Sequence, residues 1–251
     1  MMAQGDGLDP ADWSEMRGLG HRIMDEAIDH LAGVRDRPVW QEMPAEVRAA
    51  FTGPLPRDGI GAEAAYEAML ATVRPWPMGN IHPRFLAWYM GAGNVVGALG
   101  DFLAAIDGSN LGGGNTAPAL LERQVIRWMA ELTGLPASAG GTLTSGGSVA
   151  NLIALTVARN AWAAAEAGRD IRADGVGGLK LRFYASDQVH SCHRKAMEIL
   201  GLGHKALRLV PSDPEGRLPG AALARAVAED RAAGMVPVAV IGSAGTVNTG
   251  A

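Results

Sequence analysis

The sequence contains little cysteine and no long apolar segment. Cys192 is the single cysteine among 251 residues, which excludes an intrachain disulfide and a cysteine-based zinc cluster. No run of about 18 apolar residues occurs, so no membrane-spanning helix is expected. The first ten residues carry two aspartates and lack the apolar core of a secretory signal. These features predict a soluble, cytoplasmic protein that is not attached to a membrane.

The charge pattern excludes further classes of protein. The net charge is −4, which gives no basic surface for nucleic acid. Cys192, His193 and Lys195 lie close together, but no second cluster of ligand residues accompanies them, so we predict no metal site. Lysine is scarce, because the chain has only Lys180, Lys195 and Lys205.

The first 80 residues are predicted to be helices joined by loops. Apolar spacing and capping residues predict helices over 12–34, 43–51 and 62–73. Proline and glycine mark loops at 52–59 and 74–80. Because this segment shows little sign of a core of its own, we expect residues 1–80 to pack on the rest of the chain or on a partner subunit. The segment is interpreted as a dimerisation or packing arm.

Residues 81–251 are predicted to form an α/β domain. Helices are expected over 95–106 and 119–132, and strands and helices alternate from residue 179 onward. The strands are predicted at 179–185, 206–210 and 236–241, with helices at 191–200 and 218–233 between them. This alternation is typical of a parallel sheet covered by helices. Ligands in such folds bind beyond the carboxyl ends of the strands.

The stretch Gly140–Arg159 carries the main signal for a binding site. A short β-type run at 142–144 is followed by Ser145-Gly-Gly-Ser148 and then by a helix that is predicted to run to Ala167. The first amides of such a helix have no intrahelical partner, and the helix dipole adds positive charge, so the turn can bind an anion. No lysine follows the glycines, which favours a phosphate monoester over a nucleoside triphosphate. The alternative is an ordinary strand–helix turn with a serine cap.

Two other polar segments follow predicted strands at the same edge of the sheet. His190 comes just after Asp187, where a neutral imidazole could stack on a flat ring or transfer protons. The alternative is a solvent-facing loop histidine. Thr246 and Asn248 could reach a phosphate or a ring substituent, and the alternative there is a turn closed by its own side chains.

An apolar segment with a histidine lies earlier in the chain. Trp88 and Tyr89 stand beside glycines and could wall a substrate pocket, although buried core is an alternative. His82, which precedes Pro83, is compatible with either role.

Several motifs occur together in one order and at compatible spacing. Taken as a set, they resemble the pyridoxal-phosphate-dependent group II decarboxylases, the family of aromatic L-amino-acid, histidine and glutamate decarboxylases. The resemblance runs from about Asp12 to Ala251. The motifs that carry it are His82-Pro-Arg-Phe85, the loop 110–118, Gly141-Thr-Leu-Thr-Ser-Gly-Gly-Ser-Val-Ala-Asn151, Tyr184-Ala-Ser-Asp-Gln-Val-His190 and Gly242-Ser-Ala-Gly-Thr-Val-Asn-Thr-Gly250.

The resemblance implies a fold, a cofactor and a reaction. The fold is the large domain of fold type I, the aspartate aminotransferase fold, preceded by the N-terminal helical segment. The cofactor is pyridoxal 5′-phosphate (PLP), and the reaction converts an amino-acid substrate to an amine and carbon dioxide while the cofactor ring accepts electrons. Family members are homodimers with active sites at the subunit interface, so a second copy of the chain is implied.

The resemblance also implies roles for individual residues. Gly147 and Ser148 match the positions that hold the cofactor phosphate. His190 matches the catalytic histidine that stacks on the pyridine ring and contacts the substrate carboxylate. Thr246 lies in another cofactor-contacting loop. The implied substrate pocket includes His82, Trp88 and Tyr89.

Three departures from the family pattern limit what the resemblance implies. Val247 and Gly91 stand where aromatic-amino-acid decarboxylases have threonines, which leaves the substrate open. The family's cofactor-binding lysine and the aspartate that pairs with the pyridine nitrogen would lie beyond Ala251, and none of the three lysines matches by position. We therefore expect the chain to be a fragment: a truncated or frameshifted reading frame, or an artificially shortened polypeptide.

Two other functions are compatible with the same residues. The first is a different fold type I PLP enzyme, such as an aminotransferase or a lyase. The second is a non-catalytic relic that binds phosphate or a partner subunit. The Asp187–His190 motif and the His82-Pro83 segment favour a decarboxylase over an aminotransferase.

Overall fold

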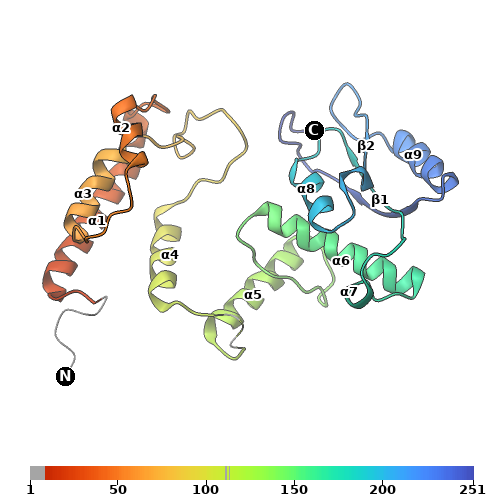
Figure 1. The fold of residues 1–251 in the computed structure, drawn as a ribbon, viewed down its shortest axis with the longest axis horizontal. Coiled ribbons are helices and arrows are strands. Elements are labelled where there is room, and N and C mark those ends of the chain that lie inside the picture. Colours follow the sequence, from red (N-terminus) through yellow and green to blue (C-terminus); the bar gives the residue numbers. More distant parts are fainter. Residues whose placement is uncertain (1–8, 111, 113) are drawn as a thin grey trace. The chain divides into compact units, whose positions relative to one another are not determined.

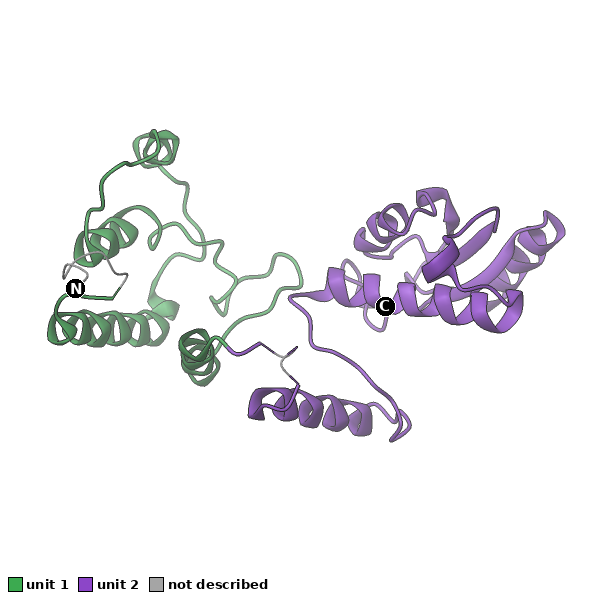
Figure 2. Ribbon diagram, turned by 60° about the horizontal axis from the view of Figure 1, so that its bottom comes forward, with its two compact units in different colours: residues 1–108 green, residues 109–251 purple. Residues whose placement is uncertain are grey.

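A computed structural model describes residues 9–110, 112 and 114–251 (Figure 1). The chain divides into two compact units, unit 1 (Met1–Gly108) and unit 2 (Ser109–Ala251), which Figure 2 distinguishes by colour. The functional boundary that the sequence predicts after residue 80 stays a prediction. None of the helices in the described ranges is both long enough and apolar enough to cross a membrane.

Unit 1 consists of helices joined by irregular segments, as the sequence predicts. Asp12 caps the first helix, because its carboxylate accepts a hydrogen bond from the Ser14 amide at 2.7 Å. Each predicted helix is found to within a few residues. The elements are α1 (Trp13–Ala32), η1 (Val34–Asp36), α2 (Ala45–Ala49), η2 (Ala50–Thr52), α3 (Ala62–Thr72) and α4 (Val95–Asp107).

Polar contacts join α1 to α3. The guanidinium of Arg22 lies 2.9 Å from Glu63 and 2.7 Å from Glu67, and its Cζ lies 4.9 Å from the centroid of the Tyr66 ring. The Tyr66 hydroxyl donates to Glu26 at 2.7 Å. Within residues 9–108, Tyr66 is the only buried hydrophobic side chain. Unit 1 is therefore held by exposed ion pairs and local contacts, each of which stabilises weakly.

Apolar side chains remain exposed on these helices. Trp13 on α1 is 64% exposed, and Val96, Phe102 and Ile106 on α4 are also exposed. A contiguous exposed apolar surface marks an interaction site. The exposure of Trp13 agrees with the expectation that residues 1–80 pack on another surface, which itself stays a prediction, whereas α4 lies outside that segment.

Unit 2 contains the parallel sheet that the sequence predicts. The three predicted strands and the helices between them are found with end shifts of one or two residues, whereas the short helix α7 was not predicted. The elements are α5 (Ala117–Leu132), α6 (Gly147–Ala167), α7 (Ile171–Asp174), β1 (Leu181–Ser186), α8 (Cys192–Ile199), η4 (His204–Ala206), β2 (Leu207–Val210), α9 (Gly220–Ala232) and β3 (Val236–Ile241).

The described strands lie in the order β2-β1-β3, and β1 pairs in parallel with both neighbours. The pairing of β1 with β3 shifts register between Arg182 and Phe183, opposite Pro237. A proline has no amide to donate to the ladder, which accounts for the irregularity. Parallel pairing places the loops after Ser186, Val210 and Ile241 at one edge of the sheet.

Helices cover both faces of the sheet. Phe183 and Ala185 point into the core formed with α6 and α8, whereas Tyr184, between them, packs with Ala226 of α9. This alternation follows from the two-residue period of a strand. The topology requires the same layout, because β1–α8–β2 and β2–α9–β3 are crossovers in opposite directions, and right-handed crossovers then place their helices on opposite faces.

The predicted short strand at 142–144 is not formed. Among the described residues it pairs with no strand, and Leu143 is 58% exposed. The Leu143 amide instead donates to Glu122 Oε1 of α5 at 2.8 Å. A strand needs a neighbour to satisfy its backbone groups, and a side chain takes that place here.

A buried carboxylate joins the sheet to α9. Asp230, which is 7% exposed, lies 2.9 Å from Arg208 Nη1 on β2 and 3.3 Å from Arg182 Nε on β1. Burial of the Tyr184 hydroxyl, together with the neighbouring Asp230 charge, raises the pKa of Tyr184 to about 12. The aspartate thus neutralises two arginines at a place that excludes water.

Replacing Asp230 tests this arrangement. Asp230→Asn should lower the free energy of unfolding of unit 2 by about 3 kcal/mol, because it leaves Arg182 without its countercharge and Arg208 with only the exposed Glu229. Urea unfolding followed by circular dichroism measures the change. The matched control is Glu229→Gln, since Glu229 pairs with the same Arg208 but is exposed, and it should cost about 1 kcal/mol or less. Equal losses in the two variants would contradict the role given to Asp230.

Candidate functional site

The amino end of α6 has the properties of an anion site. Gly146 precedes the helix in an extended conformation, no side chain caps the helix, and its first turn contains no acidic residue. The amides of Gly147 and Ser148 donate no hydrogen bond within the described part of the chain. A Cβ added to either Gly146 or Gly147 would meet open space, so the approach to these amides is free. The turn and helix start predicted from the sequence are therefore present.

His190 lies in the loop after β1, exposed to solvent. Its Nδ1 atom accepts a hydrogen bond from the Cys192 amide at 3.2 Å. In the neutral ring the proton is then on Nε2, which leaves one ring N–H donor. An imidazole held in this way can stack on a flat ring and donate one hydrogen bond.

The loop that carries His190 is anchored to β2. The Asp187 amide donates to the Val210 carbonyl at 3.1 Å, and the Ser212 amide donates to Asp187 Oδ1 at 3.3 Å. Hydrogen bonding from Ser212 holds the pKa of the Asp187 carboxyl below its usual range. The aspartate therefore stays ionised and fixes the first turn of the loop.

His193 and Asn151 were not predicted as site residues, yet they join the His190 loop to the start of α6. The buried His193 ring lies 3.0 Å from the His190 carbonyl and 3.1 Å from Asn151 Oδ1. A sequence signal existed, because Asn151 follows Gly147 by four residues, which places both on one face of α6, and His193 follows His190 by three residues at the start of α8. The sequence could not show that these two segments meet.

Thr246 lies in the loop after β3 and is buried. Its hydroxyl is 2.6 Å from the hydroxyl of Thr249 and accepts the Ala251 amide at 3.3 Å. The loop is thus closed by its own side chains at the carboxyl edge of the sheet. A cofactor contact by Thr246 stays a prediction.

The three residues of the predicted substrate pocket belong to unit 1. His82 is buried, its Nδ1 accepts the Arg84 amide at 3.0 Å, and its Nε2 has no hydrogen-bond partner within the described ranges. Trp88 and Tyr89 are 72% and 91% exposed, which differs from the alternative of a buried core. Trp88 also has a φ of 44°, in the left-handed region that an aromatic residue rarely adopts.

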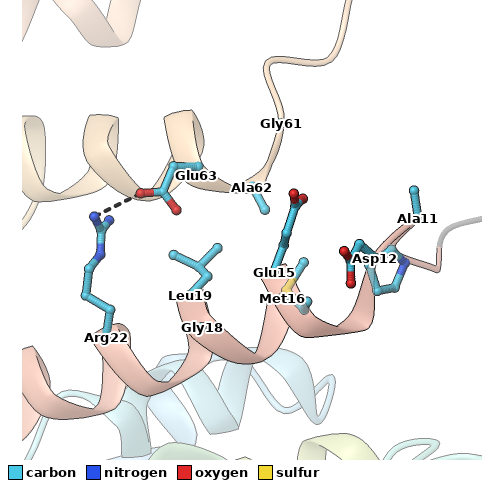
Figure 3. A pocket seen from close by; sticks show the side chains of 11 residues that line it. Ala11, Asp12, Glu15, Met16, Gly18, Leu19, Arg22, Gly61, Ala62 and Glu63 are labelled. Carbon is cyan, nitrogen blue, oxygen red and sulfur yellow. Dashed lines mark ion pairs between the residues drawn. The ribbon is translucent and has the colours of Figure 1, made fainter.

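A separate pocket of about 670 Å³ lies between α1 and α3 of unit 1. Figure 3 shows Asp12, Glu15 and Glu63 around it, with Arg22 paired to Glu63. Because three of its four charged side chains are acidic, the pocket does not suit a phosphate. The candidate cofactor site is therefore the carboxyl edge of the sheet in unit 2.

These residues fit the phosphate and ring of PLP. Two unpartnered amides at a helix start match a phosphate dianion, and the glycines leave the space in front of them free. His190 presents an exposed imidazole on the adjoining loop. The parallel sheet of unit 2, the start of α6 and the His190 loop together are the features of a fold type I PLP-dependent protein.

Comparison with known proteins specifies the family. Residues 65–251 match the pyridoxal-dependent decarboxylase conserved domain. The chain belongs to this family. It is 34% identical over 247 residues to an aromatic-L-amino-acid decarboxylase of Bacillus atrophaeus, covering 94% of the chain and 48% of that relative. It is 29% identical to histidine decarboxylase of Rattus norvegicus, covering 95% and 38%.

Solved structures agree with this assignment. The crystal structure of Oryza sativa TDC with PLP and tryptamine superposes with a TM-score of 0.84 at 26% identity, covering 98% of this chain and 52% of that one. The sequence-based predictions of the family, the fold type and the cofactor are confirmed. The chain spans about half the length of the relatives that it matches.

The phosphate site can be tested on the chain itself. Ser148→Ala should weaken PLP binding about tenfold, because it removes a hydroxyl donor to a charged phosphate. Equilibrium dialysis with absorbance detection measures the affinity. Ser138→Ala, at an exposed turn serine outside the helix start, is the control and should leave the affinity unchanged. An equal loss in both variants would argue against a phosphate at α6.

Proposed function

We propose that the protein to which this chain contributes is a PLP-dependent decarboxylase that converts an L-amino acid to an amine and carbon dioxide. The proposal is supported by the hydrogen bonds of His193, which connect the start of α6 to the His190 loop. The first amides of α6 have no partner among the described residues, and both segments lie within residues 65–251, which match the family. Phosphate binding and ring stacking need these two features side by side.

Each part of the site is assigned one task. The amides of Gly147 and Ser148 bind the cofactor phosphate at the helix start, and the Ser148 hydroxyl adds a donor. The His190 ring stacks on the cofactor, and its Nε2–H donates to the substrate carboxylate, which is the group that leaves. When bound, PLP supplies the electron sink for the bond that breaks.

Substrate selection is assigned to unit 1. The segment of His82, Trp88 and Tyr89 offers exposed aromatic surface, which suits an amino-acid side chain with a ring, and a buried histidine whose Nε2 has no hydrogen-bond partner among the described residues. Relatives named for aromatic amino acids and for histidine are both similar to this chain, so both kinds of ring are candidate substrates. Gly91 and Val247, where aromatic-amino-acid decarboxylases carry threonines, leave the choice between them open.

The oligomeric state and location are part of the same proposal. The exposed apolar side chains of α1 and α4 support a homodimer in which the N-terminal helices pack on the second subunit. The site is placed at the interface of this homodimer, in the cytoplasm.

The activity test uses the complete protein with PLP and a panel of tyrosine, tryptophan and histidine. Release of carbon dioxide with formation of the matching amine is expected for at least one of them. Formation of a keto acid without carbon dioxide would instead identify an aminotransferase, and PLP binding without either product would identify the non-catalytic alternative.

A histidine variant tests the catalytic assignment. His190→Ala should lower kcat about 100-fold or more, since it removes both the stacking ring and the donor to the carboxylate. The control is His204→Ala, because His204 is an exposed histidine that pairs with Glu198 outside the candidate site. Steady-state rates with a saturating substrate measure both effects, and an unchanged kcat in His190→Ala would remove His190 from the mechanism.

A further inference from the structure

His193 is a buried histidine that the proposed reaction does not use. Its Nδ1 lies 3.0 Å from the carbonyl oxygen of His190, and its Nε2 lies 3.1 Å from Asn151 Oδ1. The ring is 6% exposed, so water does not replace these partners. One imidazole therefore connects the His190 loop to the second turn of α6.

Asn151 continues the connection to the phosphate site. Its Nδ2 donates to the Gly147 carbonyl at 2.7 Å, and this carbonyl belongs to the same peptide unit as the Ser148 amide, which is one of the predicted phosphate-binding amides. A continuous hydrogen-bonded path thus runs from Gly147 through Asn151 and His193 to His190. The two parts of the candidate site are thus connected through two side chains that are not among the residues assigned to the phosphate or the ring.

The hydrogen-bond donors on this path can be assigned. Because Nδ2 of Asn151 donates to Gly147, its Oδ1 must face His193 as an acceptor. The His190 carbonyl is also an acceptor. The His193 ring therefore lies between two acceptors, and only a ring with protons on both nitrogens donates to both. A neutral ring would leave a nitrogen lone pair facing an oxygen lone pair.

The titratable surroundings of His193 are few. On α8, the Cys192 thiol lies 3.6 Å from Nδ1, and its burial raises the pKa of that thiol. The cationic Lys195 acts on the same thiol from the next turn of α8, whereas α6 presents the neutral Asn151. The thiol is a weak donor and is farther away than the His190 carbonyl, so the carbonyl is the preferred partner.

We propose that His193 is a positioning residue whose doubly protonated ring holds the His190 loop against the α6 helix start and so sets the spacing between the phosphate site and the stacking ring. The proposal rests on the cofactor site proposed above. It predicts that cofactor affinity depends on His193 although the residue does not contact the cofactor.

The binding test uses PLP and the chain itself. His193→Phe, which keeps a ring and removes both donors, should raise the Kd for PLP about tenfold, the scale found for partners that orient a binding group. His193→Gln restores an N–H donor and should recover part of the loss. His204→Gln is the control and should bind as the parent does. If His193→Phe binds PLP as tightly as the parent, the positioning role is wrong.

A second variant covers the case in which His193→Phe does not fold. Asn151→Asp keeps an oxygen that accepts from His193 but removes the donor to the Gly147 carbonyl. It should therefore weaken PLP binding while the His193 ring stays protonated. If Asn151→Asp binds PLP as tightly as the parent, the hydrogen bond from Asn151 to the Gly147 carbonyl does not affect cofactor binding and the proposal is wrong.

The protonation of the ring is measured directly by nitrogen-15 NMR of the imidazole side chains. Two protonated, hydrogen-bonded nitrogens on His193 at neutral pH support the proposal, and one proton-free nitrogen overturns it. This readout needs no cofactor, so it separates failure of the proposal from failure of the cofactor site. If the parent chain does not bind PLP, the proposed cofactor site fails while NMR still decides the state of His193.

Discussion

Burial of β1 on both faces is the constraint on which unit 2 depends. Phe183 and Tyr184 are adjacent in sequence and fully buried on opposite sides of the sheet, so α8 and α9 must both be in place. The parallel partners of β1 fix where each strand ends, and therefore which loops share the carboxyl edge. The His190 loop and the loop of Thr246 lie there because β1 and β3 run side by side in one direction.

The sequence was sufficient for the α/β part of the fold. The strand at 236–241 is a run of apolar and β-branched residues, and its predicted bounds match the structure. The glycines at 146 and 147 correctly predicted where α6 begins. The β-type run at 142–144 forms no strand, because such a run becomes a strand only with a neighbour, and the Glu122 side chain satisfies the Leu143 amide instead. No local pattern reveals such a long-range partner.

The site was predictable only in part for a similar reason. Gly147, Ser148 and His190 were predicted as site residues because each follows a recognisable change of secondary structure. Asn151 and His193 were missed because their roles depend on two helices meeting, which neither residue's neighbours in sequence specify. Buried polar side chains of this kind are detected only when their hydrogen-bond partners are known.

The spacing of the strands has a consequence for how the chain folds during synthesis. β1 pairs with β2 across one helix and with β3 only after β2 and a second helix, but all three described strands lie within residues 181–241. The N-terminal helices leave the ribosome first but bury only Tyr66 among their described hydrophobic side chains. Stable structure should therefore begin in the later part of the polypeptide, and the N-terminal helices must stay free of aggregation until a surface is available to them.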